Sequence, residues 1–561
     1  MADKMDNLSM RKSSVGNTAD ADLDPKQNEA ALPGELISAG SQHLHRRLGG
    51  KEIQLLAVGG AIGTSLFVQM GAALPKGGPA GLFLGFVIYG TIILSVNQCF
   101  GAEMVTYLPI ASPFVRLSGF WVDDALSFAM GWNYFFLMAF NIPYEVTAIH
   151  VLLTFWTDKI PVGAVVAVCL VIYAVLNGLT VKYFGISEFY MSIFKILLML
   201  GLMLYTFITM VGGNPDKDPY GFRYWKDPGS FVSYLVPGDT GRFLGLLSCI
   251  IQGSFTMVGP EFISMAAGEA ENPRRLISRA FVSFVWRLMF FFIGGALCVG
   301  IVIPYDDPLL AAATSSDSSS SGTGAASPYV ISMINFGIKG VPDLVNALIM
   351  TSVLSAGNNV IFSAARTLHG MALDGKAPPF FAKCNKYGLP YYAVITALCF
   401  CLLSLLQMGQ SSSTVLDWFV GICTASYLLN YIGTVITYLH FYYTMEKQGV
   451  DRSTLPYTGY LQPYAAWYAL AGTLIITLVL GYDVFISGQW DITTFFTSYT
   501  MVGFFIVAFV FWKIVKRTTY VRIGTADLKL GSTKDDIDLY EALYEKPRRG
   551  KVLGYLNSWF E

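Results

Sequence analysis

Long apolar runs alternate along the chain with short polar segments. A hydrocarbon core about 30 Å thick requires about 20 consecutive apolar residues per helix. Twelve segments meet this length and predict an all-α membrane protein whose even number of spans puts both tails on one side. The predicted spans run approximately over Ile53–Leu74, Gly81–Thr106, Ala125–Trp156, Val162–Leu179, Ile186–Val211, Gly241–Gly268, Phe281–Ile303, Val345–Leu368, Tyr391–Leu406, Leu416–Tyr442, Tyr464–Ile486 and Thr493–Val515.

Composition agrees with a membrane protein. Of the 561 residues, 54% are hydrophobic and 13% are charged, whereas ordinary soluble domains carry about 25% charged residues. The net charge of -1 gives no electrostatic reason to expect nucleic acid binding. We predict a polar N-terminal tail over residues 1–50, a membrane domain in contact with the lipid bilayer over 51–516, and a C-terminal tail over 517–561.

Basic residues near the ends of the predicted spans indicate the orientation, because Lys and Arg are retained on the cytosolic side. Loops on the side of the N-terminus carry more of them, including Arg116, Arg274, Lys376 and Arg452. Both tails are therefore expected in the cytosol. The C-terminal tail has mixed charge and few apolar runs, so we expect a solvated segment that cytosolic trafficking or ubiquitination machinery can reach.

Two of the predicted spans contain residues that interrupt a helix. The first has Gly59, Gly60 and Gly63 near its middle, and the sixth has Gly259 and Pro260 at its centre. Unwinding at membrane depth is tolerated where the freed backbone lines a cavity, although small residues also allow close helix packing. Interruptions in the first and sixth spans are typical of an inverted five-helix repeat that binds substrate near the bilayer midplane.

An interrupted helix offers chemistry at its free ends. A half-helix restarting at Gly63, Thr64 and Ser65 would direct unpaired amides and a positive dipole end at a carboxylate. Carbonyls freed near residues 58–60 and 254–257 would face a protonated amine. A zwitterionic amino acid fits both groups, so the pattern predicts an amino acid carrier.

Five charged residues lie within the apolar runs, where an unpaired charge costs at least about 2.5 kcal/mol. Glu103 and Arg287 are close to the predicted cytosolic ends of their spans, which favours snorkelling or pairing with a loop. Glu145 lies deep in the third span, and either gating, substrate contact or a structural ion pair would account for it. Lys195 is beyond easy reach of either interface, and Glu261 stands beside the interruption of the sixth span.

Burial disfavours the charged form of Lys195, which would make proton gain and loss feasible during a transport cycle. The alternative is a fixed cation neutralised by carbonyls or a carboxylate. We therefore predict Lys195, Glu145 and Glu261 as proton-coupling or gating residues.

At the level of whole motifs, the chain resembles the fungal amino acid permeases of the amino acid, polyamine and organocation superfamily. The resemblance runs from about Leu44 to Tyr520 and is most specific in LGGKEIQLLAVGGAIGTSLF, DPYGFRYWKDPGSF, AAGEAENPRRLISRA, VIPYDDP and AARTLHGMALDGKAP. It implies a LeuT-type fold of five plus five inverted helices followed by two more. It also implies proton-driven uptake at the plasma membrane.

The resemblance further implies that Phe255 closes over the substrate and that Lys195 occupies the space of a sodium ion in sodium-coupled relatives. Together with the interrupted helices, this gives a predicted set of substrate contacts: Gly60, Ile62, Gly63, Thr64, Ser65, Phe255, Thr256, Met257 and Gly259.

Within the family, the motifs VGPEF, SFVWRLMFFF and SSSTVLDWF resemble the dicarboxylic amino acid permease branch. That branch would imply glutamate and aspartate as substrates. No arginine lies at midplane in the third, eighth or tenth span, so a second carboxylate would depend on weaker donors such as Thr256, Asn358 or Asn359.

Other functions remain as alternatives. A permease of broad or neutral specificity fits the same motifs, and a non-transporting amino acid sensor would share the fold. An enzyme is not expected, because the five histidines form no HExxH or nucleophile and base set. The cysteines lie mainly in apolar stretches without a CxxC pair, so we expect neither a metal site nor a cofactor.

Overall fold

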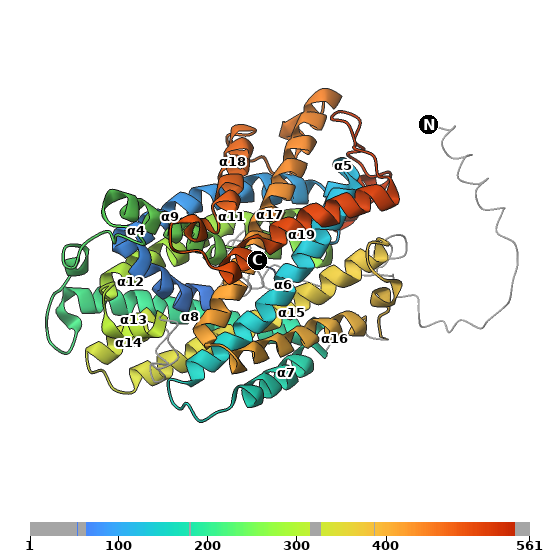
Figure 1. The fold of residues 1–561 in the computed structure, drawn as a ribbon. Helices are drawn as coiled ribbons and strands as arrows, with labels where there is room; N and C mark the ends of the chain where they lie inside the picture. The colour runs from blue at the N-terminus through green and yellow to red at the C-terminus, as the bar shows by residue number, and fades with distance from the viewer. Residues whose placement is uncertain (1–52, 54–62, 179–180, 315–326, 386–387, 545–561) are drawn as a thin grey trace, which may run out of the picture.

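The computed structural model describes residues 53, 63–178, 181–314, 327–385 and 388–544, and these form helices and loops without a β-strand (Figure 1). Within this part of the chain, nine helices are long and apolar enough to cross a membrane, and two shorter apolar helices accompany them. The prediction of an all-helical polytopic protein is confirmed at this level.

The described helices fall within most of the predicted spans, although most of the first span lies outside the described residues and α11 and α12 belong to one span. Their bounds are α4 Met70–Asn97, α6 Asp124–Leu153, α7 Val162–Gly178, α8 Val181–Ile208, α9 Gly238–Thr256, α11 Pro273–Arg287, α12 Gly294–Val302, α15 Val341–Leu373, α16 Tyr391–Cys399, α17 Ser412–Gln448, α18 Tyr464–Leu478 and α19 Ile492–Lys516. Shorter helices connect or flank them: α5 Pro113–Trp121, α10 Pro260–Met265, α13 Pro308–Thr314, α14 Pro328–Asn335 and α20 Thr533–Tyr544.

Several spans continue through π or 3-10 turns rather than α-helix. The π segments are Ser65–Gln69, Gln98–Val105, Thr209–Gly213 and Leu288–Ile293, and a 3-10 segment covers Phe400–Met408. Inside α4, Gly78 has φ 73° and ψ 175°, between Pro75 and Pro79. This backbone is not helical, so Gly78 divides the end of the first predicted span from the second.

Helix α6 lies at the centre of the bundle, where it packs against α15, α17 and α19 (Figure 1). The peripheral helices α8 and α19 instead expose large apolar side chains such as Leu197, Leu204 and Val507. In water such a surface would aggregate, whereas in a bilayer it is the face that contacts lipid. The buried centre therefore lies on α6 and its neighbours.

Glu103 is fully buried and joins the second span to the loop that follows α17. Its carboxylate forms an ion pair with Arg452 and accepts hydrogen bonds from Tyr438 Oη at 2.7 Å and the Gly459 amide at 2.5 Å. Of the two outcomes expected for Glu103, the structure therefore shows pairing with a loop and not snorkelling.

Arg287 extends back along its own helix toward the N-terminal end of α11. Its Nη2 donates to the carbonyl of Ala280 at 3.1 Å, and its guanidinium lies 5.6 Å from the ring centre of Phe284. Nε and Nη1 find no hydrogen-bond partner among the described residues. Arg287 is thus buried and bonded within its own helix, and its snorkelling or pairing with a loop stays a prediction.

The C-terminal tail packs on the ends of the membrane helices as far as residue 544, so the expectation of a solvated tail is wrong for this part. Ile537 and Tyr540 of α20 are buried. Arg274 forms ion pairs with Asp538 at 2.6 Å and Glu541 at 3.0 Å. A tail of mixed charge can dock because its few apolar residues fall on one face of α20 and its acids meet a loop arginine.

We expect Arg274→Ala to loosen this docked tail. Loss of a partly buried ion pair is worth about 1 kcal/mol, which corresponds to a roughly fivefold higher population of the released tail. Limited proteolysis of detergent-solubilised protein measures it as faster cleavage within residues 518–544. Arg275→Ala is the matched control, because Arg275 is exposed on the same turn. Equal cleavage of both variants would show that the ion pairs of Arg274 do not hold the tail in place.

Candidate binding site

The sixth span is interrupted where its sequence predicts. Helix α9 ends at Thr256 and α10 begins at Pro260, which has no backbone N–H to continue the helix. Gly259 adopts φ 151° and ψ -34°, a conformation that residues with a side chain rarely adopt. The prediction of a break at Gly259 and Pro260 is confirmed, and Val258 lies within it.

Among the described residues, the helical backbone of the first span begins at Thr64, immediately after Gly63. Thr64 is buried, and its Oγ1 donates to Oε2 of Glu145 on α6 at 2.5 Å. This contact ties the restarted helix to the centre of the bundle. Three further positions of the predicted interruption lie outside the described residues: Gly59, Gly60 and Ile62.

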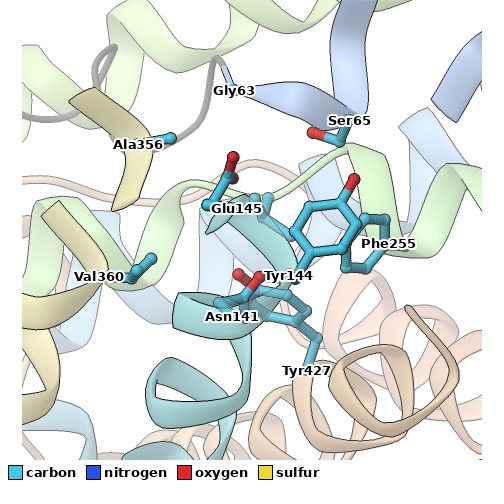
Figure 2. A pocket seen from close by; sticks show the side chains of 10 residues that line it. Gly63, Ser65, Asn141, Tyr144, Glu145, Phe255, Ala356, Val360 and Tyr427 are labelled. Atoms are coloured by element: carbon cyan, nitrogen blue, oxygen red, sulfur yellow. The ribbon is translucent and has the colours of Figure 1, made fainter. Parts of the chain in front are cut away.

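A pocket with about 340 Å³ of empty space, part of it continuous with solvent, opens between the described start of the first span at Gly63 and the interruption of the sixth span. Residues from six segments of the chain line it: Gly63, Ser65, Asn141, Tyr144, Glu145, Phe255, Val258, Ala356, Val360 and Tyr427 (Figure 2).

Apolar and aromatic side chains form most of the pocket wall. Phe255 and Tyr144 meet edge to face, with ring centres 5.2 Å apart at an angle of 82°. Figure 2 shows Ala356 and Val360 of α15 on the opposite side of Glu145 from Phe255. The pocket is therefore bounded by α15 on one side and by aromatic rings on the other.

Glu145 is the one charged residue among the described residues that line the pocket. Its carboxylate points toward Gly63 in Figure 2 and is held there by the Thr64 hydroxyl. The site thus places a carboxylate beside the restarted first helix. Such a group attracts a cationic amine and repels a second carboxylate.

Lys195 is buried in α8 and lies 3.9 Å from Glu188 of the same helix, measured from Nζ to Oε1. Sequence reasoning named Lys195 but missed Glu188, which falls only two residues inside the predicted fifth span. The spacing of seven residues was the available signal, because it places two side chains on the same face two turns apart. A carboxylate neighbour for Lys195 agrees with one of the two alternatives considered for that residue.

Glu261 does not line the pocket. Its carboxylate accepts hydrogen bonds from the Gly259 amide at 3.1 and 3.3 Å and from Tyr431 Oη at 2.8 Å. A carboxylate in the first turn of a helix satisfies free amides and interacts favourably with the helix dipole. Through these contacts, Glu261 connects the start of α10 to Tyr431 of α17.

Five other predicted contacts also lie outside the pocket, among them Gly259, whose amide donates to Glu261. Thr256 donates to the Gln252 carbonyl, and the Met257 amide donates to the Gly253 carbonyl. Asn358 accepts from Asn177, and Asn359 donates to Glu188. Of the predicted substrate contacts, Gly63, Ser65 and Phe255 line the pocket. Thr64 does not line it but donates a hydrogen bond to Glu145, which does.

Most of the remaining lining residues could not be named from the sequence. Asn141, Tyr144 and Glu145 fall at i, i+3 and i+4, which places them on one face of α6 and was a usable signal. Tyr427, Ala356 and Val360 look like ordinary helix-packing residues in the sequence. Only the assembled bundle selects them.

The sequence matches the family described as "Amino acid permease" over residues 52–523. It is 42% identical over 476 residues to the "General amino acid permease AGP2" of Saccharomyces cerevisiae, covering 84% of this chain and 79% of that protein. A "Proline-specific permease" of Emericella nidulans is 38% identical, with 88% and 89% of the two chains covered. The "Dicarboxylic amino acid permease" of S. cerevisiae is 31% identical, with 99% and 91% covered.

These relatives do not single out the dicarboxylic branch. Among solved structures, a manganese transporter of Eremococcus coleocola has a similar fold, with a TM-score of 0.50 and 12% identity. The match covers 88% of this chain and 94% of the transporter. At this identity the likeness concerns the arrangement of helices alone.

Proposed function

This chain belongs to the amino acid permease family of multi-pass membrane proteins, and on that premise we propose that it carries neutral amino acids of a broad range into the cell together with protons. The observation that supports this most directly is the lining of the pocket. It combines one carboxylate with aromatic and aliphatic walls.

For the membrane arrangement, we propose twelve spans in a LeuT-type order of five plus five inverted helices and two more. Nine long and two shorter apolar helices among the described residues, together with the division at Gly78, support this number. The interruption at Gly259 supports a discontinuous sixth span. We place the protein in the plasma membrane with both tails in the cytosol, because the connections expected on that side carry more basic residues, and Arg274 at the start of α11 pairs with α20 of the C-terminal tail.

The bound amino acid would lie between the two interrupted helices. Its carboxylate would face the amide of Ser65 at the start of the described first helix, where the dipole end is positive, because Thr64 already bonds Glu145. Its ammonium group would face Glu145. Its side chain would then occupy the apolar space between Phe255 and Val360, which favours neutral side chains.

Proton coupling would involve Glu145 and Lys195. Both are buried, and each lies within the electrostatic influence of the other. Arrival of a substrate ammonium beside Glu145 would change the charge that Lys195 experiences. A proton taken up or released by this pair would then accompany the substrate.

Acidic substrates are the second candidate, supported by the resemblance to the dicarboxylic branch and by the 31% identity to the dicarboxylic permease. The pocket favours neutral substrates over them. Among the lining residues, neither an arginine nor a lysine stands ready to bind a second carboxylate, and Glu145 would repel it. A non-transporting sensor is the third candidate, and accumulation of label inside the cell separates it from a carrier.

Uptake by a yeast strain that lacks its own amino acid permeases tests the proposal. Each labelled amino acid is supplied singly, and the best substrate is then challenged with the others in excess. We expect accumulation and mutual competition of neutral amino acids, abolished by a protonophore. Inhibition by glutamate and aspartate alone would support the dicarboxylic alternative, and signalling without accumulation would support a sensor.

A further inference from the structure

A polar cluster beside the pocket connects α8 to α15, and sequence reasoning did not identify it. Glu188 of α8 is 2% exposed, and its Oε1 accepts hydrogen bonds from Ser355 Oγ at 2.5 Å and Asn359 Nδ2 at 2.6 Å. Both donors are buried residues of α15. The Glu188 carboxylate is therefore clamped by α15 on one of its two oxygens.

The pairing of Glu188 with Lys195 is incomplete in this arrangement. The 3.9 Å between Lys195 Nζ and Glu188 Oε1 exceeds a hydrogen bond. The second oxygen, Oε2, is buried and has no hydrogen-bond partner among the described residues. A buried carboxylate oxygen without a partner is costly, so a fixed structural ion pair would be expected to satisfy it. Oε2 is thus a position that a proton or the Lys195 ammonium can occupy.

The same stretch of α15 also forms one wall of the pocket. Ala356 and Val360 line the cavity, and Ser355 and Asn359 each precede one of them by a single residue. Consecutive residues of an α-helix are about 100° apart around its axis, so the two pairs form adjacent rows. A shift of α15 against a bound substrate would therefore also shift the clamp on Glu188.

The titratable groups around this cluster come from three helices. Lys195 shares α8 with Glu188, Glu145 on α6 acts on Lys195, and Tyr173 on α7 lies within the influence of Glu188. The Tyr173 hydroxyl packs against Gly357 of α15, where an added Cβ would lie 2.0 Å from it. Lys195 is consequently within the electrostatic influence of two carboxylates, Glu145 in the pocket wall and Glu188 held by α15.

We propose that Glu188 is a positioning residue for coupled transport. Because Ser355 and Asn359 hold its carboxylate, a movement of α15 changes the distance between Glu188 and Lys195. Pocket occupancy thereby determines whether Glu188 or Glu145 neutralises the lysine. This inference rests on the proposed function, because it requires amino acid transport driven by protons.

Glu188→Gln tests the role of the charge, because the amide oxygen of glutamine still accepts from Ser355 and Asn359. The purified protein is reconstituted into proteoliposomes with the neutral amino acid that the uptake assay identifies as the best substrate. We expect accumulation driven by a pH gradient to fall roughly tenfold, a usual size for coupling between two sites. Exchange of label between equal internal and external substrate should stay within about twofold of the parental rate. Asp239→Asn is the matched control, because this carboxylate is 94% exposed.

The double variant Glu188→Gln with Lys195→Met separates coupling from a merely structural ion pair. We expect its thermal stability to match the parental protein, since both charges are gone, while accumulation stays lost. Recovery of accumulation in the double variant would overturn the inference, as would an equal loss of exchange and accumulation in Glu188→Gln. A parental protein that neither exchanges nor accumulates amino acids would overturn the proposed function itself.

Discussion

Glu145→Gln is expected to reduce uptake of neutral amino acids roughly 10- to 150-fold, because a hydrogen bond to a charged group contributes about 1.5–3 kcal/mol. Glutamine preserves the size of the side chain and can still accept the hydroxyl of Thr64, which lies 2.5 Å from Oε2 in the parental protein. The variant therefore keeps the shape of the side chain and removes the charge that the proposal places opposite the substrate ammonium and within the influence of Lys195. Initial uptake rates, normalised to protein at the cell surface, measure the effect.

Two comparisons give this experiment its meaning. Asp239→Asn makes the same chemical change at an exposed site and should leave uptake unchanged. Thr64→Val removes the donor while keeping the Glu145 charge, so its loss should be smaller than that of Glu145→Gln. An uptake rate for Glu145→Gln within about threefold of the parental rate would argue against ammonium binding at this carboxylate.

Gly63→Ala is expected to lower uptake roughly 10- to 100-fold by filling the space between the restarted first helix and α15. An added Cβ would lie 2.9 Å from Ala356 Cβ and 3.1 Å from Glu145 Oε1. Overpacking of this kind costs about 1–3 kcal/mol. Alanine is itself a better helix former than glycine, so a loss would reflect the site rather than the helix.

A second change should relieve this clash. Ala356→Gly removes the methyl group that the new Cβ would meet, so the double variant should recover part of the uptake lost in Gly63→Ala. Gly503→Ala is the matched control, because a Cβ at Gly503 of α19 would meet nothing within 4 Å. If the double variant transports no better than Gly63→Ala, contact between these two positions is not the cause.

Local sequence was sufficient for features that depend on a single segment. The break in the sixth span follows from Pro260, which lacks an amide, and from Gly259, which tolerates its backbone angles. Helical periodicity likewise places Asn141 and Glu145 on one face of α6, although it does not say what that face meets. The twelve-span count and the inverted repeat stay predictions, since most of the first span lies outside the described residues.

Contacts between distant segments were less accessible. Glu103 pairs with Arg452, 349 positions away along the chain, and Glu188 meets Ser355 at a separation of 167. A tail judged solvated from its composition proved to carry a docked helix, because Ile537 and Tyr540 find apolar cover beside Arg274. Neither member of such a pair identifies the other in the sequence.

The sequence by itself determined that this is a membrane protein of many helices, where the sixth helix breaks, and which family it resembles. These features follow from apolar run length, from backbone chemistry and from motifs, all of which are local. Only the tertiary structure decided that Glu145 would line the pocket while Glu261 would cap α10, and that Glu188 would be held by Ser355 and Asn359 beside Lys195. The physical reason is that helix periodicity defines the faces of each helix, whereas the packing of all helices together decides which faces meet.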